Sequence, residues 1–485
     1  MNNEVFERAR LSRDPSFDGQ FFVAVKTTGI YCRPICPANS PKSDNVSFFR
    51  TAAAAGEAGY RPCLRCRPEC APGTPAWAGT STTVQRGLRL IAEGALDEGN
   101  VDQLAARLGV TSRHLRRLFT RHLGASPLAV AHTQRLHFAK ALLDQTSLPM
   151  REIAVASGFG STRRFNDTFR KTYGRAPREL RRARESDLVD SAFSVQLAYR
   201  QPFDWPALLE FFAARATPGV EQVCGDRYLR TITVGDERGI IDVCDVGGKL
   251  LLKLHGIATT SLVAAVQCVR GLFDLDAAIG DVHQVLSRDT ALARMLKARP
   301  GIRVPGAWDG FELTVRAILG QQVSVRAATT LAARVANRYG PEIDVAISGL
   351  QQVPNRLFPG PGKLRRARLE SLGITGSRAR SIRAVAKATA DGHLCFDAAQ
   401  DPEAFVEALK LIPGIGDWTA QYVAMRALKN PDAFPAADLG LLRAFDTEGR
   451  KRMKPAELLQ RAEAWRPWRA YAALLIWGSS TGVGG

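Results

Sequence analysis

The sequence predicts a multidomain α+β protein. After a short amino-terminal part, we expect a helical block, a stretch with strands and a second helical block, in that order. With 485 residues, the chain is too long for one hydrophobic core. A Pro/Gly-rich break at 70–76 and a charged run at 178–190 divide it. Helical and strand-like patterns alternate between these breaks, which places the expected domains at 1–75, 83–182, 191–280 and 290–480.

Four of the nine cysteines form two close pairs near the amino terminus. The segments Cys32-Arg33-Pro34-Ile35-Cys36 and Cys63-Leu64-Arg65-Cys66 have the paired spacing by which four thiolates surround a tetrahedral zinc ion. The pattern therefore predicts one zinc ion bound by Cys32, Cys36, Cys63 and Cys66. The spacing alone leaves a purely structural zinc site open as an alternative.

The remaining features of the sequence favour a cytoplasmic protein. The start, Met1-Asn2-Asn3-Glu4, has no basic region followed by an apolar run, and no segment is long and apolar enough to span a bilayer. We therefore expect reduced thiols and no membrane partner. We assign no role to Cys70, and we interpret the scattered cysteines as core residues: Cys224, Cys244, Cys268 and Cys395.

The sequence segments around the cysteine pairs resemble the amino-terminal domain of adaptive-response regulators. The matching segments run from Phe22 to Pro34, from Asn45 to Phe49 and from Gly59 to Cys63. The resemblance implies that Cys32 accepts a methyl group, once per molecule, from a methylphosphotriester of the DNA backbone. Zinc would then be both structural and activating, because it keeps the sulfur as the nucleophilic thiolate. Methylation would also remove one negative charge and raise DNA affinity.

The basic charge of the chain is concentrated in its second part. Residues 76–185 carry 19 lysines and arginines against 9 acidic residues, which is over half of the net charge of +19 on less than a quarter of the chain. Such a block suits a polyanion, and nucleic acid is the commonest one in the cytoplasm. A solvated basic face is the alternative.

The same block contains a duplicated helix-turn-helix pattern. Asn100 caps a helix from Val101 to Leu108, and a second helix follows from Ser112 to Leu123. The arrangement recurs as Met150 to Ser157 and Thr162 to Tyr173, and both copies end in Gly-X-Ser/Ala-Pro. This duplication resembles the DNA-binding domain of AraC-type regulators. Side chains not needed for packing are the candidate DNA contacts, with base and phosphate roles left open: Arg113, Arg116, Arg117, Arg163, Arg164, Asn166 and Arg170.

The carboxy-terminal part contains the segment Leu411-Ile412-Pro413-Gly414-Ile415-Gly416-Asp417-Trp418, which resembles the helix-hairpin-helix of base-excision glycosylases. We expect the two glycines to allow a tight turn whose amides, at Gly414, Ile415 and Gly416, bind a DNA phosphate. An ordinary turn between helices is the alternative. In this superfamily an aspartate some twenty residues beyond the hairpin is catalytic, so the resemblance implies that role for Asp438.

Two flanking segments make the resemblance more specific: over about residues 193–477 the chain resembles 3-methyladenine DNA glycosylase II. They are Ala317-Ile318-Leu319-Gly320-Gln321-Gln322-Val323 and Trp465-Arg466-Pro467-Trp468. Trp418 stands where glycosylase/lyase members have lysine, so no Schiff base is expected and the enzyme should be monofunctional. Trp418, Tyr422 and Trp477 correspond to aromatic residues of the base pocket. Gln322 replaces the leucine that relatives insert into the duplex, and is a possible wedge.

The resemblances together imply a small zinc-binding α/β domain, an all-α double helix-turn-helix domain, a small mixed strand and helix subdomain and an all-α helix-hairpin-helix glycosylase core. The implied function is DNA alkylation repair and its transcriptional regulation. Double-stranded alkylated DNA is the implied partner, with RNA polymerase when the protein acts as an activator, and we expect a monomer. No Pro-Cys-His-Arg motif is present, so repair of O6-alkylguanine is not expected. One alternative is a regulator whose glycosylase half is a catalytically silent DNA clamp.

Overall fold

The computed structural model describes residues 3–71, 82–97, 99–181, 193–350, 352–397, 400–445 and 453–480. It confirms the multidomain α+β class, and the chain divides into two compact units. One comprises residues 1–201, 246–268 and 275–278, and the other comprises 202–245, 269–274 and 279–485. The predicted break at 70–76 and the charged run at 178–190 lie largely outside the described residues, so the four expected boundaries stay predictions.

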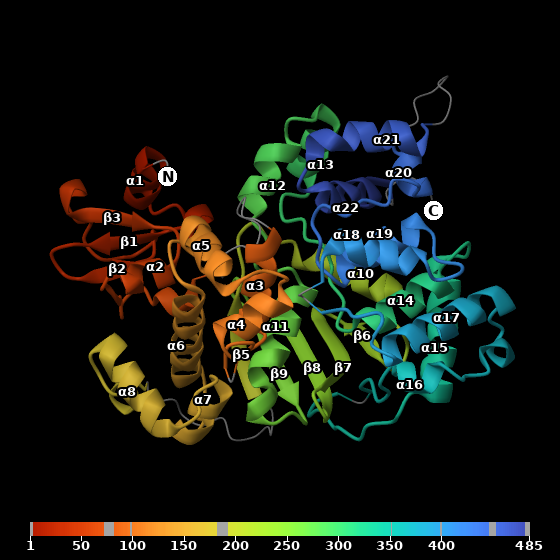
Figure 1. The fold of residues 1–485 in the computed structure, drawn as a ribbon, viewed down its shortest axis with the longest axis horizontal. Helices are drawn as coiled ribbons and strands as arrows, with labels where there is room; N and C mark the ends of the chain where they lie inside the picture. The colour runs from red at the N-terminus through yellow and green to blue at the C-terminus, as the bar shows by residue number, and fades with distance from the viewer. Residues whose placement is uncertain are drawn as a thin grey trace. The chain divides into compact units, whose positions relative to one another are not determined.

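The amino-terminal domain is a four-stranded sheet with a helix on each face (Figure 1). Its elements are α1 (Asn3–Ser12), β1 (Phe22–Val25), β2 (Ile30–Cys32), β3 (Val46–Phe49), α2 (Ala52–Glu57) and β4 (Arg61–Pro62). The strand order is β3-β1-β2-β4. Side chains alternate along β1, so Phe22 packs toward α2 while Val23 packs toward α1. Both faces of this small sheet are therefore covered.

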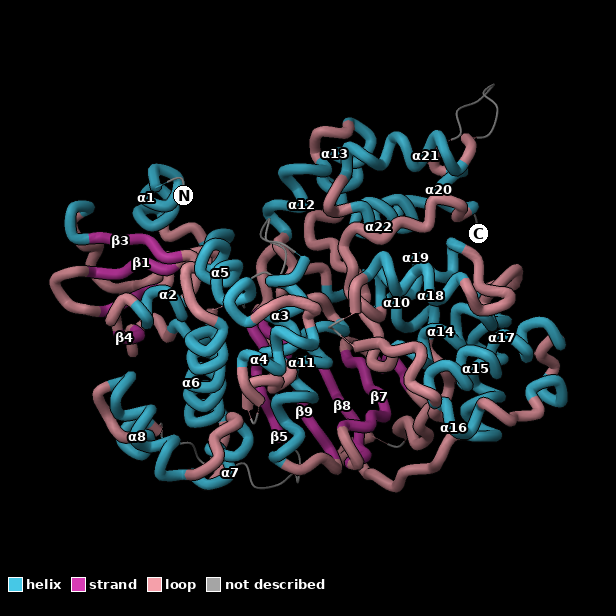
Figure 2. Tube along the Cα trace, in the orientation of Figure 1, coloured by secondary structure: helices cyan, strands magenta, loops and turns pink. Residues whose placement is uncertain are grey.

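The helical block follows the predicted duplication closely (Figure 2). Its helices are α3 (Thr82–Ala92), α4 (Val101–Arg107), α5 (Ser112–Leu123), α6 (Pro127–Gln145), α7 (Met150–Ala156), α8 (Thr162–Tyr173) and α9 (Pro177–Leu180). Asn100 forms a capping box with Gln103, as its side-chain chemistry predicts. The two second helices, α5 and α8, are both capped by a hydroxyl residue and both end at a glycine with φ near +71°.

The mixed subdomain contributes a five-stranded sheet of order β5-β9-β8-β7-β6. Its strands and first helices are β5 (Phe193–Ala198), α10 (Trp205–Arg215), β6 (Glu221–Cys224), β7 (Arg227–Val234), β8 (Glu237–Asp245), β9 (Lys249–His255) and α11 (Leu262–Leu272). The predicted strands at 228–234 and 250–254 are confirmed as β7 and β9. Helices resume at Leu262 rather than near residue 290, because Leu262, Val266 and Val269 already have helical spacing and are buried.

The carboxy-terminal core is helical, as predicted. Its helices are α12 (Ile279–Leu286), α13 (Thr290–Ala298), α14 (Gly310–Leu319), α15 (Val325–Tyr339), α16 (Pro361–Leu364), α17 (Gly376–Ala390), α18 (Pro402–Lys410), α19 (Asp417–Arg426), α20 (Leu439–Arg443), α21 (Pro455–Ala462) and α22 (Arg469–Ser480). Helix α14 is buried on nearly every side and contacts α15, α17 and α19. Among the described residues, none of the helices has the length and apolar character required to cross a membrane.

Candidate functional site

The four paired cysteines come together as the spacing predicts. Their sulfur atoms all lie within 4.8 Å of one another. Parallel pairing of β2 with β4 matches Tyr31 to Pro62, and this register brings Cys32 at the end of β2 next to Cys63 just after β4. Four soft sulfur donors without oxygen or nitrogen ligands are the donor set that suits tetrahedral zinc.

The cysteine cluster differs in exposure from one thiol to the next. Cys66 is buried, whereas Cys32 is partly exposed. The backbone N–H of Arg33 donates to Cys66 Sγ over 3.3 Å, and the Arg33 guanidinium pairs with Asp18. An N–H bond to sulfur stabilises thiolate charge. Cys66 is thus held inside the domain, whereas the other three cysteines, Cys32, Cys36 and Cys63, are all partly exposed.

Two of the scattered cysteines do not fit their predicted role. Cys224 and Cys395 are exposed, and Cys244 and Cys268 are partly buried. The expectation that all four are core residues is therefore wrong for Cys224 and Cys395. Cys224 ends β6, at the edge of the sheet, and Cys395 lies after α17, so neither position faces a packed interior.

The cysteine domain packs directly on the helical block within the same unit. Tyr31, which precedes Cys32, has its hydroxyl 3.0 Å from His137 Nε2 on α6. The Thr51 hydroxyl donates to the carbonyl of Leu123 over 3.0 Å, at the end of α5. Helix α2 lies against α6 in the same region (Figure 1). The helix α5 is thus anchored at its carboxyl end by the domain that carries the cysteines.

The candidate DNA contacts lie on the solvent-facing sides of α5 and α8. The inward faces are closed by fully buried side chains such as Leu115 and Phe165. Asn166 is half-buried. The six arginines are exposed: Arg113, Arg116, Arg117, Arg163, Arg164 and Arg170. The two helices therefore present equivalent basic faces, as the duplicated pattern implies.

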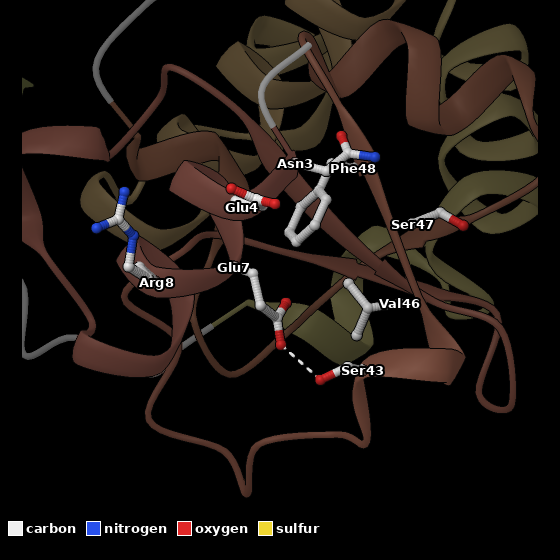
Figure 3. A pocket seen from close by; sticks show the side chains of 8 residues that line it. All are labelled: Asn3, Glu4, Glu7, Arg8, Ser43, Val46, Ser47 and Phe48. Carbon is white, nitrogen blue, oxygen red and sulfur yellow. Dashed lines mark hydrogen bonds between the residues drawn. The ribbon is translucent and has the colours of Figure 1, made fainter.

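A hollow also opens on the amino-terminal domain, beside α1 and β3 (Figure 3). Val46 and Phe48 contribute apolar surface, and the Ser43 hydroxyl donates to Glu7 over 2.6 Å. None of the four clustered cysteines lines it. It is therefore distinct from the candidate metal centre.

The predicted hairpin joins α18 to α19. Gly414 has φ of +85°, and a Cβ there would lie 2.2 Å from Ser381 Oγ, so only glycine fits. Gly416 is different: its backbone is extended, and a Cβ would meet no atom within 4 Å. Steric conflict therefore requires glycine only at position 414, whereas Gly416 serves as the N-cap of α19. The Ile415 side chain is buried, which leaves only its backbone for a phosphate.

Asp438 lies at the start of α20 and accepts three hydrogen bonds. Trp418 Nε1 donates to Oδ2 over 2.8 Å, and Trp477 Nε1 donates to Oδ1 over 2.8 Å. The backbone N–H of Leu441 donates to Oδ1 over 3.0 Å, so Asp438 is also the N-cap of its helix. Three N–H donors complement the negative charge of the carboxylate and fix its orientation.

The predicted pocket aromatics form one cluster around this carboxylate. The rings of Trp418 and Tyr422 are stacked, with centroids 5.3 Å apart and planes 6° apart. Trp477 lies 6.4 Å from Tyr422 at an angle of 60°. Tyr422 Oη accepts a hydrogen bond of 2.6 Å from Arg426 Nη1. Sequence reasoning missed Arg426, although its position one helical turn after Tyr422 is a signal that was present.

Gln322 has a left-handed backbone, with φ of +54°, and its side chain is exposed. The neighbouring Gln321, also missed from the sequence, ties this loop to the hairpin. Its Nε2 donates to the Gly414 carbonyl over 3.0 Å and to Thr419 Oγ1 over 3.1 Å. The loop that carries the possible wedge is thus fixed against the hairpin.

Four known families match successive parts of the chain. The metal binding domain of Ada matches residues 6–69, and a helix-turn-helix domain matches 104–183. The AlkA N-terminal domain matches residues 194–309, and the HhH-GPD superfamily of base excision DNA repair proteins matches 315–470. The fold and the sites therefore define a DNA-binding protein that joins a zinc domain and a helix-turn-helix domain to a base-excision glycosylase.

Individual relatives agree with this division. The probable bifunctional transcriptional activator/DNA repair enzyme AlkA of Mycobacterium tuberculosis is 40% identical over 476 residues, covering 97% of this chain and 95% of the relative. The DNA-3-methyladenine glycosylase 2 of Escherichia coli is 38% identical over 288 residues, which cover 58% of this chain and 95% of that protein. The chain belongs to the family of bifunctional transcriptional activator/DNA repair enzymes of the AlkA type.

A solved 3-methyladenine DNA glycosylase from Archaeoglobus fulgidus shares the fold of the carboxy-terminal part. It aligns with a TM-score of 0.52 at 21% identity, covering 60% of this chain and 98% of that chain.

The family match and the four-cysteine cluster also establish that the amino-terminal domain binds one structural zinc ion.

Proposed function

We propose that this protein combines two repair reactions with regulation of transcription. In the first reaction, Cys32 takes a methyl group from a DNA methylphosphotriester, once per molecule. In the second, the carboxy-terminal half excises alkylated bases such as 3-methyladenine as a monofunctional glycosylase. The observation that carries the proposal is the carboxylate of Asp438, oriented by two indole N–H groups within an aromatic cluster.

The excision reaction follows from the position of Asp438. As the bond between C1′ of the sugar and the base nitrogen breaks, its electron pair leaves with the base, and positive charge develops on the sugar. Water then adds to C1′ and releases a proton. Oδ1 already accepts two hydrogen bonds and Oδ2 accepts one, so one lone-pair position of Oδ2 remains for the sugar or the water. This arrangement favours Asp438 as the negative charge that stabilises the sugar cation.

The assignment of methyl transfer to Cys32 rests on its place as the first of the four cysteines in the domain that matches the metal binding domain of Ada, since Cys36 and Cys63 are partly exposed as well. The Cys32 sulfur attacks the methyl carbon, the S–C bond forms, and the O–C bond breaks with its electron pair on the phosphate oxygen. Bound zinc keeps the cysteine deprotonated at neutral pH. The product is a thioether and an ordinary phosphodiester. The loss of one thiolate charge reduces repulsion between the domain and phosphates, which would raise DNA affinity.

The exposed arginines of α5 and α8 support sequence-specific DNA binding as a regulator, with base and phosphate contacts divided between them. At the glycosylase, the hairpin amides from Gly414 to Gly416 would bind a phosphate, and Gln322 would fill the space of the displaced base. Contact with RNA polymerase, a monomeric state and a cytoplasmic location stay predictions from the sequence.

We expect one zinc ion per chain, and we expect it to be lost when Cys63→Ser and Cys66→Ser are combined, because only two thiolates of the cluster remain. The matched control is Cys224→Ser with Cys395→Ser, which changes two exposed cysteines outside the cluster. Elemental analysis of the purified chains measures both. Full zinc occupancy in the Cys63/Cys66 variant would overturn the assignment of ligands.

Removing arginines from a recognition helix should weaken duplex binding and flatten its salt dependence, since fewer counterions are released. For Arg163→Ala combined with Arg164→Ala, we expect the slope of log K against log salt to become less steep by roughly one to two units. Arg288→Ala combined with Arg294→Ala, outside the helical block, removes the same charge and serves as control. An unchanged slope in the first variant would place α8 away from the DNA.

A further inference from the structure

Arg426 is a buried arginine directly behind the aromatic cluster. It is 6% exposed, and its Nη1 donates to Tyr422 Oη over 2.6 Å. Its Nε and Nη2 donate to the carbonyl oxygens of Pro305 and Gly306 over 2.8 and 2.9 Å. All three guanidinium nitrogens are therefore engaged, and the side chain has one fixed position.

Among the described residues, no carboxylate lies within ion-pair distance of Arg426. Within the described part of the chain, its only partners are those two carbonyls, the Tyr422 hydroxyl and the rings of Phe211 and Tyr422, whose centres lie 4.9 and 5.4 Å from its Cζ. An arginine stays charged, and burying an unpaired charge costs free energy.

The charge of Arg426 lowers the pKa of the Tyr422 hydroxyl. Burial by itself raises the pKa of the Tyr422 hydroxyl. The charges of Arg426 and Arg215, together with the hydrogen bond from Arg426, outweigh burial and hold this pKa below its ordinary value. The Tyr422 O–H is therefore polarised, and its hydrogen remains available as a donor because Oη is the acceptor toward Arg426.

The aromatic cluster is bonded to two groups of opposite charge. Trp418 is bonded to the carboxylate of Asp438 through Nε1, and its ring stacks on Tyr422. Tyr422 in turn is bonded to Arg426. The stacked rings of Trp418 and Tyr422 therefore connect the negative carboxylate of Asp438 to the positive guanidinium of Arg426.

We propose, building on the glycosylase function above, that Arg426 is a positioning residue for base excision that acts through Tyr422. It holds the Tyr422 hydroxyl as a polarised donor on the side of the departing base, while Asp438 stabilises the sugar. When the bond from C1′ breaks, its electron pair moves toward the base, and a positive charge on that side lowers the energy of the transition state. A cationic base departs neutral. An uncharged base departs as an anion and then takes up the proton released by the attacking water.

The test compares two leaving groups in single-turnover excision by the full chain. Duplexes carry one 7-methylguanine, which is cationic, or one hypoxanthine, which is uncharged. For Arg426→Gln, which keeps a hydrogen-bond donor without the charge, we expect hypoxanthine release to fall roughly tenfold more than 7-methylguanine release. Arg426→Lys should restore most of that ratio. Tyr422→Phe leaves the two carbonyl contacts of Arg426 intact and should shift the ratio in the same direction.

Two further measurements separate this role from a structural one. Binding to a duplex with an abasic-site analogue should be unchanged in all variants. Adding Arg426→Gln to Tyr422→Phe should change the ratio no further, because the arginine acts through the hydroxyl. Equal losses on both substrates, or no restoration by lysine, would make Arg426 merely structural. A wild-type chain that releases 7-methylguanine but no hypoxanthine would also contradict the inference. Release of neither base would instead refute the glycosylase function itself.

Discussion

Asp438→Asn should reduce the single-turnover rate of 3-methyladenine excision by roughly 100- to 1,000-fold, the scale on which loss of one preorganised electrostatic contact acts. The amide carries no negative charge to stabilise the sugar cation. It also places an N–H group where one carboxylate oxygen now accepts from an indole, either that of Trp418 or that of Trp477, so the pocket loses a hydrogen bond. Released base is measured by chromatography.

The control for this substitution is Asp344→Asn, which changes an exposed aspartate of the same unit. It should excise at the wild-type rate. Both variants should bind a duplex with an abasic-site analogue equally well, because the hairpin is unchanged. Excision by Asp438→Asn at the normal rate would show that the carboxylate is not the catalytic group.

Cys32→Ala should abolish methyl uptake from phosphotriester-containing DNA while leaving excision of 3-methyladenine intact. The variant removes the nucleophile, whereas Asp438 lies in the other compact unit. Mass spectrometry of the chain after incubation with methylated duplex detects the transferred methyl group. Cys395→Ala, at an exposed cysteine outside the cluster, should still take up one methyl group per chain.

The zinc content of the Cys32→Ala variant must be measured in the same experiment, because the variant keeps only three of the four cysteine ligands. Methylation of another cysteine in Cys32→Ala would move the acceptor role to that residue. Complete loss of excision in this variant would instead show that the two reactions depend on each other.

Local patterns were predictable because their causes are local. The cap at Asn100 and the duplicated helix ends follow from side-chain chemistry and spacing within a few residues. The zinc cluster was predictable for another reason: paired cysteines have few other uses in a reduced protein. The fold class followed from the same local patterns.

Features that depend on distant packing were not predictable. The cysteine spacing predicted the cluster but not the strand pairing that forms it, the parallel pairing of β2 with β4. Arg426 owes its fixed position to the carbonyls of Pro305 and Gly306, more than a hundred residues away. Gly416 looked equivalent to Gly414, but only the latter meets a distant side chain, that of Ser381. Such contacts exist only in three dimensions.

The most direct test of the whole account uses one wild-type preparation and one methylated duplex that carries both phosphotriesters and 3-methyladenine. Released base and methylated cysteine are measured in the same reaction. The account predicts many bases released per chain, because excision is catalytic, and a single methyl group per chain, on Cys32, because no group regenerates the thiolate. Base release without any cysteine methylation would mean that the zinc site is only structural. Methylation without base release would mean that the glycosylase half is a silent DNA clamp, and either result would contradict the account.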